Sequence, residues 1–168
     1  MDKFQNKYRI PSTRLQHWDY GQPAAYFVTI CTKGRENHLG DVVNGKMNLS
    51  GVGIIADILW HEIKNHTPNI DLGEFVVMPN HVHGIIIIHN SDNISPKSKS
   101  LPTIIRSYKS AVSKHAHRLG FNFAWQLHFY DHIIRNEQSF QTISEYIMNN
   151  PLKWNENKFN PTNKTAEE

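Results

Sequence analysis

Two histidines separated by one residue, His81 and His83, are the sharpest chemical feature of the sequence. They follow a Pro79-Asn80 turn and open a run rich in isoleucine, which predicts that both lie on a strand. Side chains two positions apart on a strand point to the same side of the sheet, so the two imidazoles could bind one metal ion. The pattern is also typical of two hydrogen-bonded structural histidines, and two ligands alone are too few for a stable metal site.

Tyr146 and Asn150 form a second candidate pair, because residues four apart on a helix lie on the same face. An asparagine amide oxygen suits a hard divalent cation, and a tyrosine offers a phenolic oxygen, so the pair could place a nucleophile beside a metal. Taken alone, the pair has a simpler explanation. Tyr146 would pack at the edge of an apolar stripe, and Asn150 would end the helix before Pro151.

Cysteine chemistry is excluded as the basis of a site. The chain has one cysteine, Cys31, which rules out an intrachain disulfide framework and any cysteine-rich zinc or iron–sulfur site. A metal must therefore use histidine, carboxylate or amide ligands.

The elements that must position these residues follow from local patterns. Asn44-Gly45 predicts a hairpin turn, Ser50 caps a first helix, Pro102 suits the first turn of a second, and Asn136 caps a third that Pro151 stops. The predicted strands are residues 24–32, 74–78 and 81–89, with a further strand within 121–134. This order predicts an α+β fold, an antiparallel sheet with helices packed mainly on one face.

The chain of 168 residues fits one domain. We expect this domain to span residues 1–154, with residues 1–20 as an N-terminal arm, and residues 155–168 to form a polar, frayed C-terminal tail. The longest aliphatic run is Ile85–Ile88, which is too short to cross a membrane, and the polar N-terminus lacks the apolar region of a signal peptide. These features favour a cytoplasmic protein with no membrane partner.

Positive charge is concentrated in the second half of the chain. The stretch from Lys97 to Arg135 contains seven Lys and Arg residues and a single acid, Asp131. A polyanion could dock there, although a solvated helix face explains the charge equally well. The aromatic residues Trp125, Phe129 and Tyr130 of this stretch could stack on bases or form ordinary core.

Several sequence motifs, taken together, indicate a resemblance to a known protein family. The sequence resembles the REP-associated tyrosine transposases and the related single-tyrosine transposases of small insertion sequences, and the resemblance spans nearly the whole core. It rests on residues 26–29 (YFVT), 77–83 (VMPNHVH), 125–126 (WQ), 130–136 (YDHIIRN) and 145–151 (EYIMNNP). It implies a ferredoxin-like HUH endonuclease fold with His81 and His83 as metal ligands and Tyr146 as nucleophile. Asn150 would be the third ligand, following the REP-associated branch, because the insertion-sequence branch commonly has Gln there.

The expected activity is metal-dependent cleavage and rejoining of single-stranded DNA near hairpin repeats, through a 5′-phosphotyrosine intermediate with Mg²⁺ or Mn²⁺. The insertion-sequence relatives are dimers whose tyrosine helix can serve the partner's site, whereas REP-associated relatives can work as monomers, and both remain open here. Two alternatives are a nucleic-acid-binding domain without catalysis and a hydrolase that uses His81 and His83 to activate water. The residues expected to contact DNA are Lys97, Lys99, Arg106, Lys109, Tyr130 and Arg135.

Overall fold

The computed structural model of the protein describes residues 3–4, 7–8, 23–89 and 99–166. Most of the expected arm and one expected DNA contact, Lys97, lie outside these ranges. Within the arm, β1 (Lys3–Phe4) and β2 (Lys7–Tyr8) pair antiparallel. In the described part of the chain, no helix is long and apolar enough to cross a membrane.

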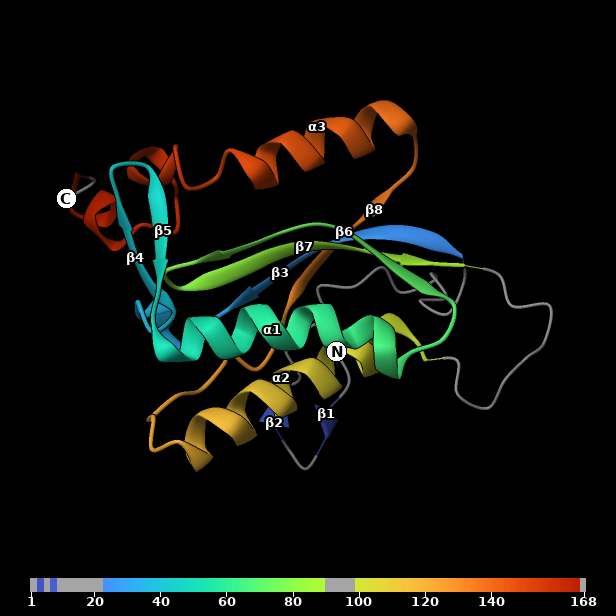
Figure 1. The fold of residues 1–168 in the computed structure, drawn as a ribbon, viewed down its shortest axis with the longest axis horizontal. Coiled ribbons are helices and arrows are strands. Elements are labelled where there is room, and N and C mark those ends of the chain that lie inside the picture. The colour runs from blue at the N-terminus through green and yellow to red at the C-terminus, as the bar shows by residue number, and fades with distance from the viewer. Residues whose placement is uncertain (1–2, 5–6, 9–22, 90–98, 167–168) are drawn as a thin grey trace.

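A four-stranded antiparallel sheet forms the centre of the molecule (Figure 1), with strand order β6-β7-β3-β8. Its strands are β3 (Ala24–Cys31), β6 (Ile70–Met78), β7 (His81–Ile88) and β8 (Tyr130–Ile134). All four predicted strands are present, but β6 starts at Ile70 rather than Glu74. The pairing slips between Leu72 and Phe75, and this irregularity hides the alternation of polar and apolar residues in the sequence.

Two long helices cover one face of the sheet, and a third lies on the other (Figure 1). These are α1 (Gly51–His66), α2 (Leu101–Arg118) and α3 (Glu137–Met148). The predicted caps are confirmed: the Ser50 side chain accepts a hydrogen bond from the Gly53 amide at 3.1 Å, and Asn136 Oδ1 accepts one from Ser139 at 2.8 Å. The α+β fold with its helices mainly on one face is therefore confirmed.

Alternation along the strands divides the sheet into two apolar layers. On β3, Tyr26, Val28 and Ile30 belong to the main core with α1 and α2, whereas Ala25 and Phe27 pack in the smaller core under α3. The same alternation on β7 sends one set of side chains toward Trp60 of α1 and the other set, which includes the two histidines, toward α3.

Part of the segment 155–168, expected to be a polar, frayed tail, is packed against the preceding residues. Trp154, Phe159 and Asn160 are buried, and Trp154 and Phe159 pack with Cys31 and Met78 at one end of the sheet. Asn160 Nδ2 donates to the Trp154 carbonyl at 3.1 Å, so polar side chains also hold the segment in place. Two aromatic residues in a polar stretch were too sparse to show a period, yet their burial is enough to anchor it.

The remaining elements are short. A two-stranded hairpin projects from the sheet beside the C-terminal segment (Figure 1), and three 3-10 helices complete the chain. They are β4 (Gly40–Val43), β5 (Lys46–Leu49), Lys33–Arg35, Trp154–Glu156 and Pro161–Ala166.

Candidate active site

The two histidines lie side by side at the start of β7, with ring centroids 4.5 Å apart, and both are buried. Each ring is oriented through its Nδ1 atom. The His81 Nδ1 lies 2.8 Å from Oδ1 of Asn80, and the His83 Nδ1 lies 2.8 Å from Oγ1 of Thr29, its partner on β3. Hydrogen bonds of this kind fix ring orientation in metal-ligating histidines.

The Asn80 side chain also fixes the tautomer of His81. Its Nδ2 donates to the carbonyls of Arg35 and Phe159, so its Oδ1 must accept the proton carried by the His81 Nδ1. The lone pair of this imidazole is therefore on Nε2. The Nε2 atoms of both His81 and His83 are buried and have no hydrogen-bond partner among the described residues. Buried ring nitrogens without a partner need an explanation, and a metal ion would provide one.

Burial also keeps both imidazoles uncharged. Loss of hydration is the main cause that lowers the pKa of His83 to about 3, with the positive charge of Lys158 adding to it. The pKa of His81 is likewise held well below its usual value by burial first, and then by the charges of His83, Arg35 and Lys158. Neutral imidazole is the form that binds metal ions.

Tyr146 reaches the same place from α3. Its ring centroid lies 5.5 Å from that of His83 and 6.1 Å from that of Phe27, and the side chain is 44% exposed. A cavity of about 440 Å³ opens between them, lined by Phe27, Thr29, Arg35, His83, Tyr130, Asp131, His132, Tyr146, Lys158 and Phe159. Within a single chain, the structure thus brings a partly exposed phenol beside the buried imidazole of His83, which itself packs on His81.

Asn150 lies one turn beyond Tyr146 and is buried. Its Oδ1 accepts a hydrogen bond from Nδ2 of Asn157 at 2.9 Å, and together with Tyr146 it lines a smaller neighbouring cavity of about 290 Å³. The described residues contain no group of three or more His, Cys, Asp or Glu side chains that could hold a metal. A metal ion held by His81 and His83 would therefore need further ligands of another type, such as an amide oxygen or water.

Two basic residues of the cavity were missed by the sequence analysis. Arg35 follows β3 in a tight turn, and Lys158 belongs to the segment expected to be a tail. The guanidinium carbon of Arg35 lies 4.9 Å from the centroid of the Phe159 ring, and Lys158 Nζ lies 5.2 Å from it. Phe159 in turn packs on His81 at a centroid distance of 4.5 Å. No local pattern signals that these segments meet at the site.

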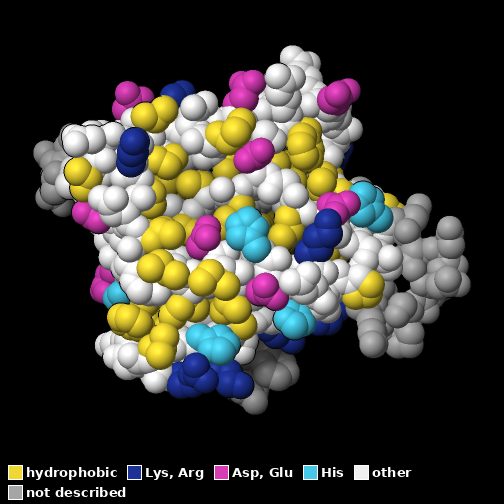
Figure 2. Space-filling model, in the orientation of Figure 1, with side chains coloured by type: hydrophobic (Ala, Val, Ile, Leu, Met, Phe, Trp, Pro, Cys, Tyr) yellow, Lys and Arg dark blue, Asp and Glu magenta, His cyan; other side chains and the backbone are white. Residues whose placement is uncertain are grey.

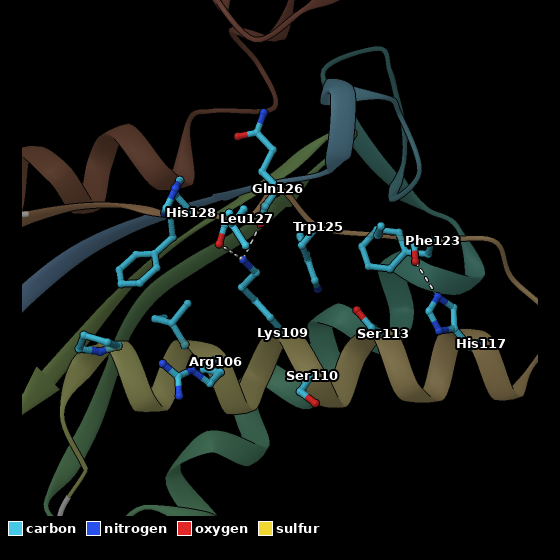
Figure 3. Close-up of a pocket in the computed structure, with 14 residues that line it drawn as sticks. Arg106, Lys109, Ser110, Ser113, His117, Phe123, Trp125, Gln126, Leu127 and His128 are labelled. Carbon is cyan, nitrogen blue, oxygen red and sulfur yellow. Dashed lines mark hydrogen bonds between the residues drawn. The ribbon is translucent and has the colours of Figure 1, made fainter. Parts of the chain in front are cut away.

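The expected DNA contacts are distributed over different parts of the molecule. Tyr130 is exposed at the cavity that also contains Tyr146. Arg135 is exposed just after β8, and Lys99 lies just before α2. Arg106 and Lys109 line a different cavity, of about 650 Å³, between α2 and residues 123–129 (Figure 3).

Lys109 helps to form the wall of this cavity rather than standing free in it. Lys109 Nζ donates to the carbonyls of Gln126 at 2.6 Å and Leu127 at 3.1 Å, which ties this segment to the helix (Figure 3). Trp125 and Phe129, considered above as base-stacking residues, are buried in the main core. On the face shown in Figure 2, Lys and Arg side chains stand in small separate groups among acidic and apolar ones. Lys and Arg side chains therefore do not form one continuous surface on that face.

Comparisons with known proteins agree with this geometry. An uncharacterized protein of Haemophilus influenzae (strain Rd) is 35% identical over 163 residues, which cover 88% of this chain and 91% of that protein. The chain belongs to the same family as this Haemophilus protein. No family model matches the chain.

A solved structure identifies the fold of this chain. The structure of a REP-associated tyrosine transposase bound to a REP hairpin superposes with a TM-score of 0.60 at 23% identity, over 86% of this chain and 74% of that one. The fold is that of the REP-associated tyrosine transposases, as the sequence motifs indicated. A second structure, from Deinococcus radiodurans R1, covers 82% of this chain and 97% of that one at 17% identity, but its TM-score of 0.44 is too low to support an assignment.

Proposed function

We propose that this protein is a transposase-type endonuclease that cleaves and rejoins single-stranded DNA next to hairpins, with Tyr146 as its nucleophile. The observation that carries the proposal is the pair of buried Nε2 atoms without partners, on His81 and His83, beside the accessible Tyr146 ring. The REP hairpin bound to the protein of similar fold supports DNA as the partner. The protein is proposed to act on DNA as a monomer or homodimer.

The residues present fit a divalent cation such as Mg²⁺ or Mn²⁺. His81 and His83 would hold it through Nε2, because their Nδ1 atoms are already engaged by Asn80 and Thr29. Asn150 would add an amide oxygen, whose second lone pair is not used by the hydrogen bond from Asn157. A cation bound there would offset negative charge on the scissile phosphate.

Tyr146 then performs the covalent chemistry. Its Oη attacks the phosphorus of the scissile phosphodiester, the Oη–P bond forms, and the bond from phosphorus to the 3′ oxygen breaks. The phenol gives up its proton and the departing 3′ oxygen gains one, which leaves a 5′-phosphotyrosine and a free 3′-hydroxyl. Attack by another 3′-hydroxyl reverses these changes and joins the strands without ATP. Edge-on packing against Phe27, with the rings at 84°, restricts the positions that the phenol can adopt beside the cavity.

The test is a covalent-adduct assay. Labelled DNA hairpins with randomised single-stranded flanks are incubated with the protein and Mn²⁺, and SDS-stable adducts are resolved on denaturing gels. We expect an adduct that disappears in Tyr146→Phe and persists in Tyr130→Phe, which removes another exposed phenol of the same cavity.

The alternatives predict different results. DNA binding without any adduct would indicate a binding domain that lacks catalysis. Turnover that is insensitive to Tyr146→Phe, without covalent DNA, would indicate a hydrolase that activates water at His81 and His83. An adduct retained by Tyr146→Phe would refute the assignment of the nucleophile.

A further inference from the structure

Two cations, Arg35 and Lys158, flank one aromatic ring at the edge of the Tyr146 cavity. Among the described residues, neither forms an ion pair with a carboxylate; the ion pairs there involve only Glu36 and Asp71 as acids. Among the described residues that line the cavity, Asp131 is the one acid, against these two cations. Two cations left unpaired by protein carboxylates in a cavity create a field that favours an anion.

The backbone holds Arg35 in a conformation that is costly for a residue with a side chain. Gly34 and Arg35 both have positive φ, at 65° and 54°, so the chain reverses sharply after β3. The turn is fixed by a hydrogen bond from Asn80 Nδ2 to the Arg35 carbonyl at 3.0 Å. Because Asn80 also orients His81, the turn that presents Arg35 and the metal-binding imidazole depend on one side chain. Strain of this kind persists where the surrounding structure holds a functional group in place.

Ring contacts give the position of the two cations relative to the nucleophile. Tyr146 lies 5.5 Å from His83 between ring centroids, and His83 lies 6.1 Å from Phe159. The cations lie a further 4.9 Å and 5.2 Å from the Phe159 centroid. Both cations contact the ring beyond the imidazoles and also line the cavity of Tyr146, so a strand that reaches Tyr146 passes within their reach.

We infer that Arg35 and Lys158 form a binding site for the phosphate adjacent to the scissile one, and that their stacking on the Phe159 ring holds the two cations in position. This inference rests on the proposed function and deepens it, because it assigns binding residues to the substrate strand. Arg35 supplies paired N–H donors that match phosphate oxygens, and Lys158 supplies a point charge. Holding this neighbouring phosphate fixes the strand so that the scissile phosphate meets Tyr146.

The alternative is that the cations only stabilise the fold by stacking on Phe159. Cation–π contacts at exposed sites contribute little to stability, and Lys158 is exposed. If the role were only structural, the effect of a substitution on DNA affinity would not depend on the charge of any single DNA phosphate. Strands with one uncharged phosphate therefore distinguish the two roles.

The experiment measures binding in a Tyr146→Phe background, so that cleavage does not interfere. Single-stranded oligonucleotides carry one uncharged methylphosphonate, placed in turn at the scissile phosphate and at each neighbour. Affinities and their salt dependence are measured by fluorescence anisotropy for Arg35→Gln, Lys158→Gln and the double variant. Lys33→Gln, an exposed cation of the same turn, is the matched control.

We expect each single variant to bind the unmodified strand roughly tenfold more weakly and to lower the salt slope by about 0.7 per charge removed. The losses should vanish on the strand that is uncharged at the phosphate next to the scissile one, and Arg35→Lys and Lys158→Arg should recover most of the affinity. Lys33→Gln should bind like its parent.

Three results would refute this phosphate-binding site. They are equal losses of affinity on every modified strand, a loss of affinity that depends on the scissile phosphate alone, and unchanged affinity in the double variant. Failure of the proposed function would look different. In that case the parent protein with Tyr146 would form no adduct on any hairpin, while the coupling to one phosphate would still be measured by binding.

Discussion

Acidification should destabilise this protein through its buried imidazoles. In the folded state the pKa of His83 is about 3, whereas an exposed histidine has a value of 6.5. Below pH 6.5 the unfolded chain takes up a proton on this ring, and the folded chain does not do so until the pH approaches 3. Protonation therefore stabilises the unfolded state, and the free energy of unfolding decreases as the pH falls through this window.

The size of the effect follows from the two values. One pKa unit corresponds to 1.36 kcal/mol, so lowering the pH from 7.5 to 4.5 should reduce the free energy of unfolding by about 2.7 kcal/mol through His83 alone. His81 adds to the loss in the same direction, because its pKa is also lowered by burial. For a domain of ordinary stability, this is a large fraction of the total.

The assay is urea unfolding followed by tryptophan fluorescence at several pH values between 4.5 and 7.5, without divalent metal. His83→Gln removes the titrating ring and should flatten the pH dependence by about 2.7 kcal/mol, even though its stability at pH 7.5 is lower. His66→Gln, on the exposed last turn of α1, is the matched control for the loss of a histidine. A slope in His83→Gln equal to that of the parent would refute the claim that this ring is buried in its neutral form.

Three further results are expected. Mn²⁺ in hundredfold excess over its Kd should raise the free energy of unfolding by about 2.7 kcal/mol at pH 7.5, and a gain that persists in the His81→Gln/His83→Gln double variant would place the ion elsewhere. Gly84→Ala should cost about 3 kcal/mol in urea unfolding, because its Cβ would lie 2.2 Å from Trp60 Cζ2; a loss below 0.5 kcal/mol would contradict this packing. Tyr108→Phe should cost about 1 kcal/mol by removing the 2.8 Å hydrogen bond to the buried Ala56 carbonyl, while Tyr130→Phe should leave unfolding unchanged.

Local sequence patterns were sufficient for most of the fold. Each α-helix begins and ends near a residue whose own chemistry sets the boundary, as with Ser50, Asn136 and Pro151. Alternation placed His81 and His83 on one face together with Ile85, and this needs no long-range information. Sequence patterns also placed Tyr146 and Asn150 one turn apart on the third helix and just beyond it.

Contacts between distant segments could not be predicted in this way. The side of the sheet that α3 covers, and therefore the meeting of Tyr146 with His83, follows from packing of the whole chain. The same holds for the return of Phe159 to His81, because a polar segment with two aromatic residues carries no period. Charge was also misleading as a guide to a surface, since Lys109 binds backbone carbonyls of its own chain.

The side of the sheet that His81 and His83 face depends on packing in the main core on the opposite side. Neighbouring residues on β7 face opposite sides of the sheet. Gly84 lies against Trp60 on the side covered by α1 and α2, while His83 faces Tyr146 on the side covered by α3. A slip of β7 by one residue would turn the histidines into the α1–α2 layer and drive a side chain against Trp60, whose ring stacks on Phe75 at 4.5 Å. The glycine required by this close contact therefore fixes the register of the strand, and the register places both imidazoles on the side of the sheet where Tyr146 lies. If His81 and His83 bind a metal as proposed, core substitutions around Trp60 should weaken that binding as well as stability, although none of these residues lies in the cavity.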